Sequence, residues 1–207
     1  ANPNNPTGIY LDRDTIARLH RGLPKRVMLV LDAAYAEFVT RNDYEPGLEL
    51  AASQPNVVML RTFSKIHALA GLRVGWLYGS TEVADMLNRV RGTFNVGLPA
   101  QAAAIASLGD EAALDRARQH NSRWRPWLED RIRELGFAVN PGVGNFVLAR
   151  FVDAPTAEAA REFLKSRLIL VRQMGAYHLP EYLRITVGTE EENRAVFAAL
   201  TEFKNRK

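Results

Sequence analysis

The sequence of 207 residues contains no cysteine. That absence excludes a disulfide framework, a thiolate zinc site, an iron–sulfur cluster and a cysteine nucleophile, and it is typical of a reducing cytoplasm, where we expect the protein to act. No apolar run approaches the roughly 18 residues that a membrane helix requires, so we expect no membrane partner. The first residues are polar turn formers, and we therefore expect no signal peptide. The four histidines have no metal-like spacing, and no metal site is expected.

Charge of one sign is also scarce, because 27 Lys and Arg face 23 Asp and Glu for a net charge of +4. The densest basic stretch, residues 116–133, is interrupted by Glu129 and Asp130. We interpret it as a solvated helix face, and we expect no nucleic-acid partner. The composition, 47% hydrophobic and 24% charged, is that of a folded globular protein.

Hydrophobic periodicity predicts an alternation of strands and helices. Short apolar runs predict strands at 27–31, 57–60, 74–78, 137–139, 145–151, 168–172 and 183–187. The first of these runs is continuously apolar, which is typical of a parallel strand buried on both faces. Helices are expected after the caps Asp12, Thr81 and Thr156, over 98–108 and 110–135, and after a Thr-x-x-Glu capping box at Thr189.

This order of elements predicts an α/β protein with two domains. Residues 1–122 indicate a large domain with a mostly parallel sheet, and residues 123–207 indicate a smaller α+β domain. Pro126 should kink the long helix between them or mark the boundary. Asp32 and Lys65 each follow a strand, at the edge where open α/β sheets bind their ligands.

Several motifs occur in the order and approximate spacing of one family. They include NPTG (5–8), DAAY (32–35), RTFSKIHALAGLRVGW (61–76), FNVGLPAQAAAIASL (94–108), NFVLARF (145–151) and LPEYLRITVGTEEEN (179–193). The sequence resembles the fold-type I aminotransferases that use pyridoxal 5′-phosphate, and among them the branch that acts on histidinol phosphate. The resemblance covers nearly the whole chain.

The resemblance implies a role for each matching residue. Lys65 would hold the cofactor as a Schiff base and move a proton during catalysis, and Asp32 would pair with the pyridine nitrogen. Tyr35 and Asn5 would donate to the cofactor's 3′-oxygen. The phosphate would be bound by Thr62, Ser64 and Arg73, and the substrate's anionic group by Arg184 with Arg172 as a second contact.

Simpler readings remain open for most of these residues. Asp32 could be a cap after its strand, Tyr35 a core aromatic residue, and Thr62 and Ser64 local turn caps. Arg172 could equally be a surface residue. Lys65 is the position for which a plain surface charge is hardest to accept, because residues 66–72 beside it are mostly apolar.

The activity implied is transamination of histidinol phosphate, the amino donor, with 2-oxoglutarate, the oxo acid, in histidine biosynthesis. Two alternatives stay open: an aromatic amino acid aminotransferase, and a cofactor-sensing regulatory domain. The resemblance also implies a homodimer. Residues 2–8 match a turn that follows a central strand in this family, so we expect further large-domain sequence to precede it and the isolated 207 residues to be inactive.

Overall fold

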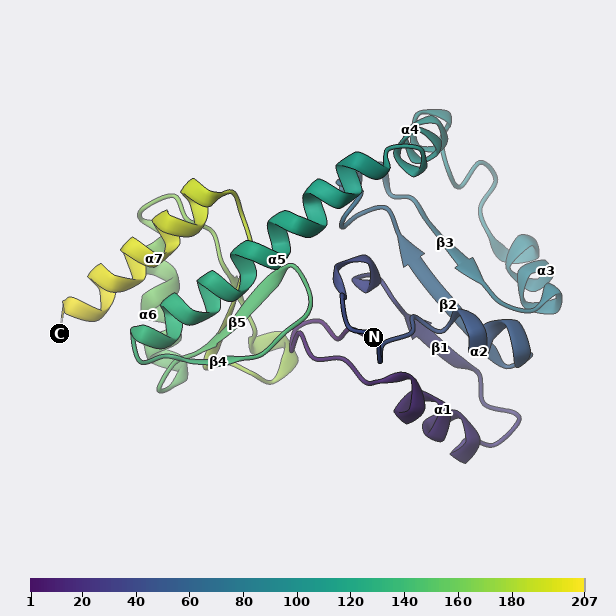
Figure 1. Ribbon diagram of the computed structural model, residues 1–207, viewed down its shortest axis with the longest axis horizontal. Helices are drawn as coiled ribbons and strands as arrows, with labels where there is room; N and C mark the ends of the chain where they lie inside the picture. The colour runs from purple at the N-terminus through teal and green to yellow at the C-terminus, as the bar shows by residue number, and fades with distance from the viewer. Residues whose placement is uncertain (207) are drawn as a thin grey trace. The chain divides into compact units, whose positions relative to one another are not determined.

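The computed structural model describes residues 1–206, which form two compact units (Figure 1). The first unit comprises residues 1–3 and 10–118. The second unit comprises residues 4–9 and the chain from Gln119 onward. Among the described residues no helix is long and apolar enough to span a membrane.

The first unit contains a three-stranded sheet in the order β1–β2–β3. β1 (Leu29–Asp32) runs parallel to β2 (Val57–Thr62), and β3 (Gly75–Tyr78) runs antiparallel to β2. The register pairs residue 29 with residue 57 and residue 32 with residue 60. The carboxyl ends of β1 and β2 therefore lie at one edge of the sheet.

Apart from α5 (Glu111–Glu134), the helices of the first unit are α1 (Arg13–Gly22), α2 (Leu48–Ser53), α3 (Thr81–Val90) and α4 (Leu98–Leu108), with single 3₁₀ turns η1 (Ala36–Phe38) and η2 (Ala70–Leu72). Of these helices, α1, α3 and α4 are predicted from the sequence and α2 is not. Asp12 caps α1 as expected, since its side chain accepts a hydrogen bond from the Thr15 amide at 2.7 Å. The predicted cap at Thr81 is wrong, because the side chain of Ser80 takes that role.

One core cluster of the first unit lies where α1 and α2 bring Ile16 and Ala51 against Leu31 and Met59. A second cluster contains Phe63, Val74, Ala100 and Ala104. Val30 points away from the first cluster and is 50% exposed. The prediction that the first strand is buried on both faces is therefore wrong for the described residues. Successive strand residues face opposite sides, and the described chain covers only one of them at this strand.

The second unit contains a four-stranded antiparallel sheet in the order β4–β5–β7–β6. Its strands are β4 (Ala138–Asn140), β5 (Phe146–Arg150), β6 (Arg172–Gln173) and β7 (Tyr182–Thr186). Its helices are the greater part of α5 (Glu111–Glu134), then α6 (Ala154–Lys165) and α7 (Glu190–Asn205), with one 3₁₀ turn η3 (Gly175–Tyr177). α5 continues through Pro126 as one helix.

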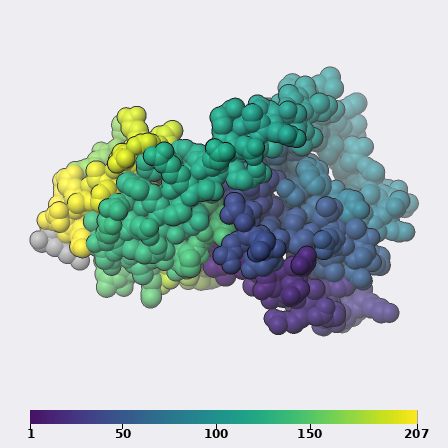
Figure 2. Space-filling model, in the orientation of Figure 1, coloured from purple at the N-terminus to yellow at the C-terminus, as the bar shows by residue number. Residues whose placement is uncertain are grey.

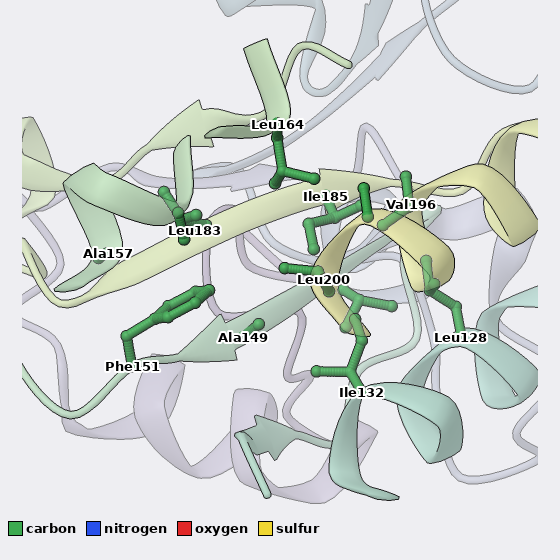
Figure 3. Packing of buried hydrophobic residues seen from close by; sticks show 13 residues of the cluster. Leu128, Ile132, Ala149, Phe151, Ala157, Leu164, Leu183, Ile185, Val196 and Leu200 are labelled. Atoms are coloured by element: carbon green, nitrogen blue, oxygen red, sulfur yellow. The ribbon is translucent and has the colours of Figure 1, made fainter. Parts of the chain in front are cut away.

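One hydrophobic cluster fills the second unit (Figure 3). Leu128 and Ile132 of α5 point towards the strands, where Leu183 of β7 lies, and Leu200 of α7 packs with them. α7 begins with the predicted capping box, in which the Thr189 side chain and the Glu192 side chain each accept from the other's amide.

Two expectations for the second unit are wrong. The cap of α6 is Asp153, whose carboxylate accepts from the Thr156 amide at 2.8 Å, so Thr156 itself lies in the first turn. The strand predicted at 168–172 is reduced to β6, because Leu168 has a φ of +61° and cannot continue an extended strand.

Candidate functional site

The carboxyl ends of β1 and β2 carry the predicted cofactor residues of the first unit. β1 ends at Asp32, and Tyr35 follows it, while β2 ends at Thr62, before Lys65. The Ala33 amide donates to the Leu60 carbonyl oxygen at 2.9 Å and continues the strand pairing past Asp32. Two separate stretches of sequence are thus held side by side where the sheet ends.

Asp32 is exposed, and its carboxylate makes a local contact. Its Oδ1 accepts a hydrogen bond from the Ala34 amide at 3.1 Å. This contact is the cap after the strand that Asp32 could provide without binding a cofactor. It occupies one of the two carboxylate oxygens. The Asp32 carbonyl oxygen accepts from the Asn2 amide at 2.9 Å. The backbone at the end of β1 is therefore held by hydrogen bonds to Asn2 and to Leu60.

Lys65 lies over the aromatic ring of Tyr35. Its Nζ is 5.2 Å from the ring centroid, which is the geometry of a cation–π contact. The Tyr35 side chain is buried and Lys65 is half-buried. A primary amine, a phenol and a carboxylate therefore share the end of two neighbouring strands.

The three predicted phosphate-binding residues lie on adjacent segments. The Thr62 hydroxyl accepts from the Ser64 amide at 3.0 Å, as the turn-cap reading expects. The Phe63 amide donates to the Val74 carbonyl oxygen at 3.2 Å, which joins this turn to the segment that holds Arg73. Arg73 is exposed, has a φ of +53°, and donates from Nη1 to the Ala70 carbonyl oxygen at 2.8 Å. Two hydroxyls and a guanidinium thus come from segments that lie side by side.

Asn5 and Arg184 lie together in the second unit. The Arg184 Nη1 donates to the Asn5 Oδ1, and the guanidinium lies 5.1 Å from the Phe146 ring centroid. The turn that carries Asn5 approaches the rest of the unit closely at Gly8. Gly8 has a φ of +76°, which favours glycine, and a Cβ there would lie 3.1 Å from the Gly142 Cα, closer than an ordinary contact.

Arg172 lies next to Arg184 across the sheet. β6 and β7 pair in a register that sets Arg172 opposite Arg184, and residues in direct register project on the same face. Arg172 is exposed, and its guanidinium lies 5.7 Å from the Tyr177 ring centroid. Like charges in this arrangement repel unless an anion lies against them, so the pair can bind an anionic group.

Sequence reasoning missed the polar contacts that hold this region. Asn2 is buried, and its amide group both donates to and accepts from the Leu11 backbone, at 3.0 and 2.8 Å. The backbone carbonyl oxygen of Asn2 accepts from the Tyr44 hydroxyl at 2.8 Å, and burial raises the pKa of Tyr44. Glu37 and Arg61 form a partly buried ion pair. Arg61 was the one sign of this ion pair in the sequence, because a charged residue near the end of an apolar strand requires a partner of opposite charge.

The chain is similar in sequence to known proteins. A family model described as "Aminotransferase class I and II" matches residues 1–200. The histidinol-phosphate aminotransferase of Nitrobacter hamburgensis is 51% identical over 100% of the chain and 57% of the relative. That of Paramagnetospirillum magneticum is 55% identical over 98% of the chain and 56% of the relative. The chain thus spans a little over half the length of these relatives.

A solved structure agrees with this similarity. The chain is similar to the crystal structure of histidinol-phosphate aminotransferase from Sinorhizobium meliloti in complex with pyridoxal-5′-phosphate, with a TM-score of 0.92 and 31% identity. The match covers 99% of this chain and 56% of that one.

Proposed function

This chain belongs to the class I and II aminotransferase family and has its type I fold, and from that membership we propose that it acts in the pyridoxal 5′-phosphate-dependent transamination of histidinol phosphate with 2-oxoglutarate. The observation that carries the proposal is the contact between Lys65 and Tyr35 beside Asp32, at the ends of two adjacent strands. Relatives named for this reaction, at 51% and 55% identity, support the choice of substrate. The reaction belongs to histidine biosynthesis, and we place it in the cytoplasm.

The residues present fit the cofactor by their chemistry. Lys65 offers the amine that an aldehyde requires, and Asp32 offers a carboxylate for a protonated ring nitrogen. Tyr35 and Asn5 offer donors for a phenolic oxygen. A phosphate needs hydroxyls and a fixed cation, which Thr62, Ser64 and Arg73 supply. We propose these seven residues as the part of the cofactor site that this chain contributes.

When bound, the cofactor supplies an electron sink for the carbanion formed at the substrate's Cα. The protein residues then have separate tasks. The Lys65 amine would take the proton from Cα of the amino donor in the first half-reaction and deliver one to Cα of the new amino acid in the second, and the buried Tyr35 ring limits where that amine can lie. Arg184, fixed by Asn5 and the Phe146 ring, orients the substrate by its anionic end.

The substrate assignment is supported by the two arginines on β6 and β7. A guanidinium can form two parallel hydrogen bonds with a phosphate or a carboxylate. Two guanidinium groups on one face of the sheet suit a phosphate dianion, and the same site can take a carboxylate of 2-oxoglutarate in the second half-reaction. We propose Arg184 as the main contact and Arg172 as the second.

The first experiment asks which lysine reacts with the cofactor. The 207-residue chain is incubated with excess pyridoxal 5′-phosphate, reduced with borohydride and mapped by mass spectrometry. We expect the pyridoxyl group on Lys65 well above its level on Lys25, Lys165 and Lys204, which serve as internal controls. Because the readout is a ratio between lysines of one chain, weak binding does not obscure it. Equal labelling of Lys65 and these three control lysines would refute the assignment of Lys65.

The second experiment asks which amino donor the site prefers. The cofactor-loaded full-length protein is mixed in single turnover with histidinol phosphate or with phenylalanine, and the cofactor absorbance is followed. We expect faster consumption with histidinol phosphate, and Arg172→Gln should slow that donor more than phenylalanine. A faster reaction with phenylalanine would favour an aromatic amino acid aminotransferase.

We also propose that the protein is a homodimer. Large apolar side chains are exposed along α3, α4 and the segment between them (Val90, Phe94, Leu98, Ile105 and Leu108). Figure 2 shows α4 at the surface of the first unit. Exposed apolar patches of this kind mark interaction surfaces. Sedimentation of the wild type and of Ile105→Glu tests this proposal, and an unchanged monomer in both would contradict it.

A further inference from the structure

A partly buried ion pair connects the two stretches of sequence that carry Tyr35 and Lys65. The Glu37 Oε1 accepts from Arg61 Nη2 at 2.6 Å and from Arg61 Nε at 3.3 Å. The two side chains are only 13% and 17% exposed. Glu37 follows Tyr35 by two residues, and Arg61 precedes Lys65 by four. The pair is therefore a second link between the segments that the Lys65–Tyr35 contact joins.

Both partners are held by further contacts. The Arg118 Nε donates to the Glu37 carbonyl oxygen at 3.0 Å. The Arg61 guanidinium lies 5.6 Å from the centroid of the Trp76 ring, and Trp76 is the register partner of Arg61 on β3. Neither charge can easily move to water, so loss of one partner leaves the other partly buried and uncompensated.

Short and rigid connections run from the ion pair to the reacting groups. Glu37 lies in η1, where the Phe38 amide donates to the Tyr35 carbonyl oxygen at 3.1 Å. Arg61 is followed by the Thr62–Ser64 turn, and Lys65 comes next. Few rotatable bonds separate the ion pair from Tyr35 and Lys65. A displacement of Glu37 relative to Arg61 should therefore move these two side chains relative to each other.

The charges of the pair also act on the loop after Lys65. Burial lowers the pKa of His67, while the carboxylate of Glu37 raises it and the guanidinium of Arg61 lowers it further. His67 packs against Phe63, with ring centroids 4.8 Å apart, and its Nδ1 lies 2.7 Å from the Ser107 hydroxyl oxygen. The ion pair thus acts on His67, which follows Lys65, and includes Arg61, which precedes it.

We propose that Glu37 and Arg61 are positioning residues whose ion pair fixes where the Lys65 amine lies against the Tyr35 ring. For the cofactor chemistry this inference rests on the proposed function, but the placement of Lys65 does not. Neither residue touches the reacting atoms. The prediction is that a change at either one alters the reactivity of Lys65.

The test measures the reactivity of each lysine without cofactor. The full chain is labelled with a limiting amount of formaldehyde and cyanoborohydride over a range of pH, and the rate at Lys65 is divided by the rates at Lys25, Lys165 and Lys204. Glu37→Gln should change this ratio by about threefold or more, the size expected for residues coupled through one network.

A double-mutant cycle distinguishes the pair from two independent effects. Glu37→Gln, Arg61→Gln and the double variant should all change the Lys65 ratio by a similar factor, because each removes the same link. Effects that multiply in the double variant would overturn the proposal. If Glu37→Gln fails to fold, Glu37→Asp keeps the charge but shortens the reach, and it should change the ratio in the same direction.

A matched ion pair in the second unit serves as the control. Glu129 and Arg125 have 7% and 19% exposed side chains and an N–O distance of 2.6 Å, close to the values at Glu37 and Arg61. Glu129→Gln should lower stability and leave the Lys65 ratio unchanged. An equal change of that ratio in Glu129→Gln would mean general destabilisation and would overturn the positioning role.

Loading with pyridoxal 5′-phosphate separates this inference from the proposed function. If the wild-type Lys65 takes no more pyridoxyl group than the other lysines, the proposed function fails, while the cofactor-free ratios still decide the role of Glu37. If Lys65 takes the group and Glu37→Gln leaves both its loading and its ratio unchanged, the function stands and the positioning role is wrong.

Discussion

Replacement of Leu128 by alanine should strongly destabilise the second unit. The Leu128 side chain is fully buried on α5, among side chains of β5, β7 and α7 such as Leu183 and Leu200. The change removes about three carbon groups at about 0.8 kcal/mol each, or about 2.4 kcal/mol. β5 and β7 pair along five register positions and cannot close around the cavity. We therefore expect a total loss of about 3–4 kcal/mol in the free energy of unfolding.

Tryptophan fluorescence can follow this unit alone. Of the three tryptophans, Trp76 lies in the first unit, while Trp124 and Trp127 lie on α5 in the second. In a Trp76→Phe background, urea unfolding then reports on the second unit. With a denaturant slope of about 1.5 kcal/mol per molar, a loss of about 3 kcal/mol lowers the midpoint by about 2 M.

The control is the same substitution at an exposed position. Leu170 belongs to the same unit and is 83% exposed, so Leu170→Ala should change the free energy of unfolding by no more than about 0.5 kcal/mol. The reasoning is refuted if Leu128→Ala costs less than about 1 kcal/mol at an unchanged slope. It is also refuted if Leu128→Ala and Leu170→Ala lower the free energy of unfolding by the same amount.

Three other predictions follow from backbone and charge. Leu168 has a φ of +61° and is 92% exposed, so Leu168→Gly should raise the free energy of unfolding by up to about 1 kcal/mol, measured as a higher urea midpoint. A Cβ at Gly75 would lie 2.7 Å from the Arg61 carbonyl oxygen, so Gly75→Ala should cost about 1–3 kcal/mol in thermal unfolding, whereas Gly71→Ala, with open space, should not. Because burial lowers the pKa of His67, the unfolded chain takes up the proton first, and stability is lost as the pH falls below 6.5; His67→Gln should flatten this loss.

Local sequence signals predicted the elements better than their ends. The helix after Asp12 and the capping box at Thr189 are confirmed, because in both a cap precedes an amphipathic stretch. The caps of α3 and α6 were assigned to the wrong residue, since Ser80 and Asp153 are equally good caps nearby. The exposed face of β1 at Val30 could not be foreseen, because an apolar run does not say which of its faces is covered.

Motifs located candidate residues but not the contacts that organise them. Lys65 and Asp32 were identified from short motifs that follow predicted strands, and the parallel pairing of β1 and β2 brings those strand ends together. The Glu37–Arg61 ion pair spans 24 residues of sequence and depends on the fold of both segments. The contact between Asn5 and Arg184 spans 179 residues, and no local pattern predicts it.

The close contact of Gly8 with Gly142 has a consequence for how the sequence can vary. The Val143 amide donates to the Gly8 carbonyl oxygen at 2.8 Å, so the two backbones cannot separate without losing this bond. At most buried contacts a larger residue on one side can be accommodated by a smaller one opposite. Here Gly8 has a φ of +76°, and a change at the residue opposite cannot relieve the strain that a side chain would meet in this backbone conformation. In a saturation library, position 8 should therefore remain glycine, whereas Gly142→Ala, whose Cβ would lie at an ordinary contact distance of 3.4 Å from the Gly8 Cα, should be tolerated.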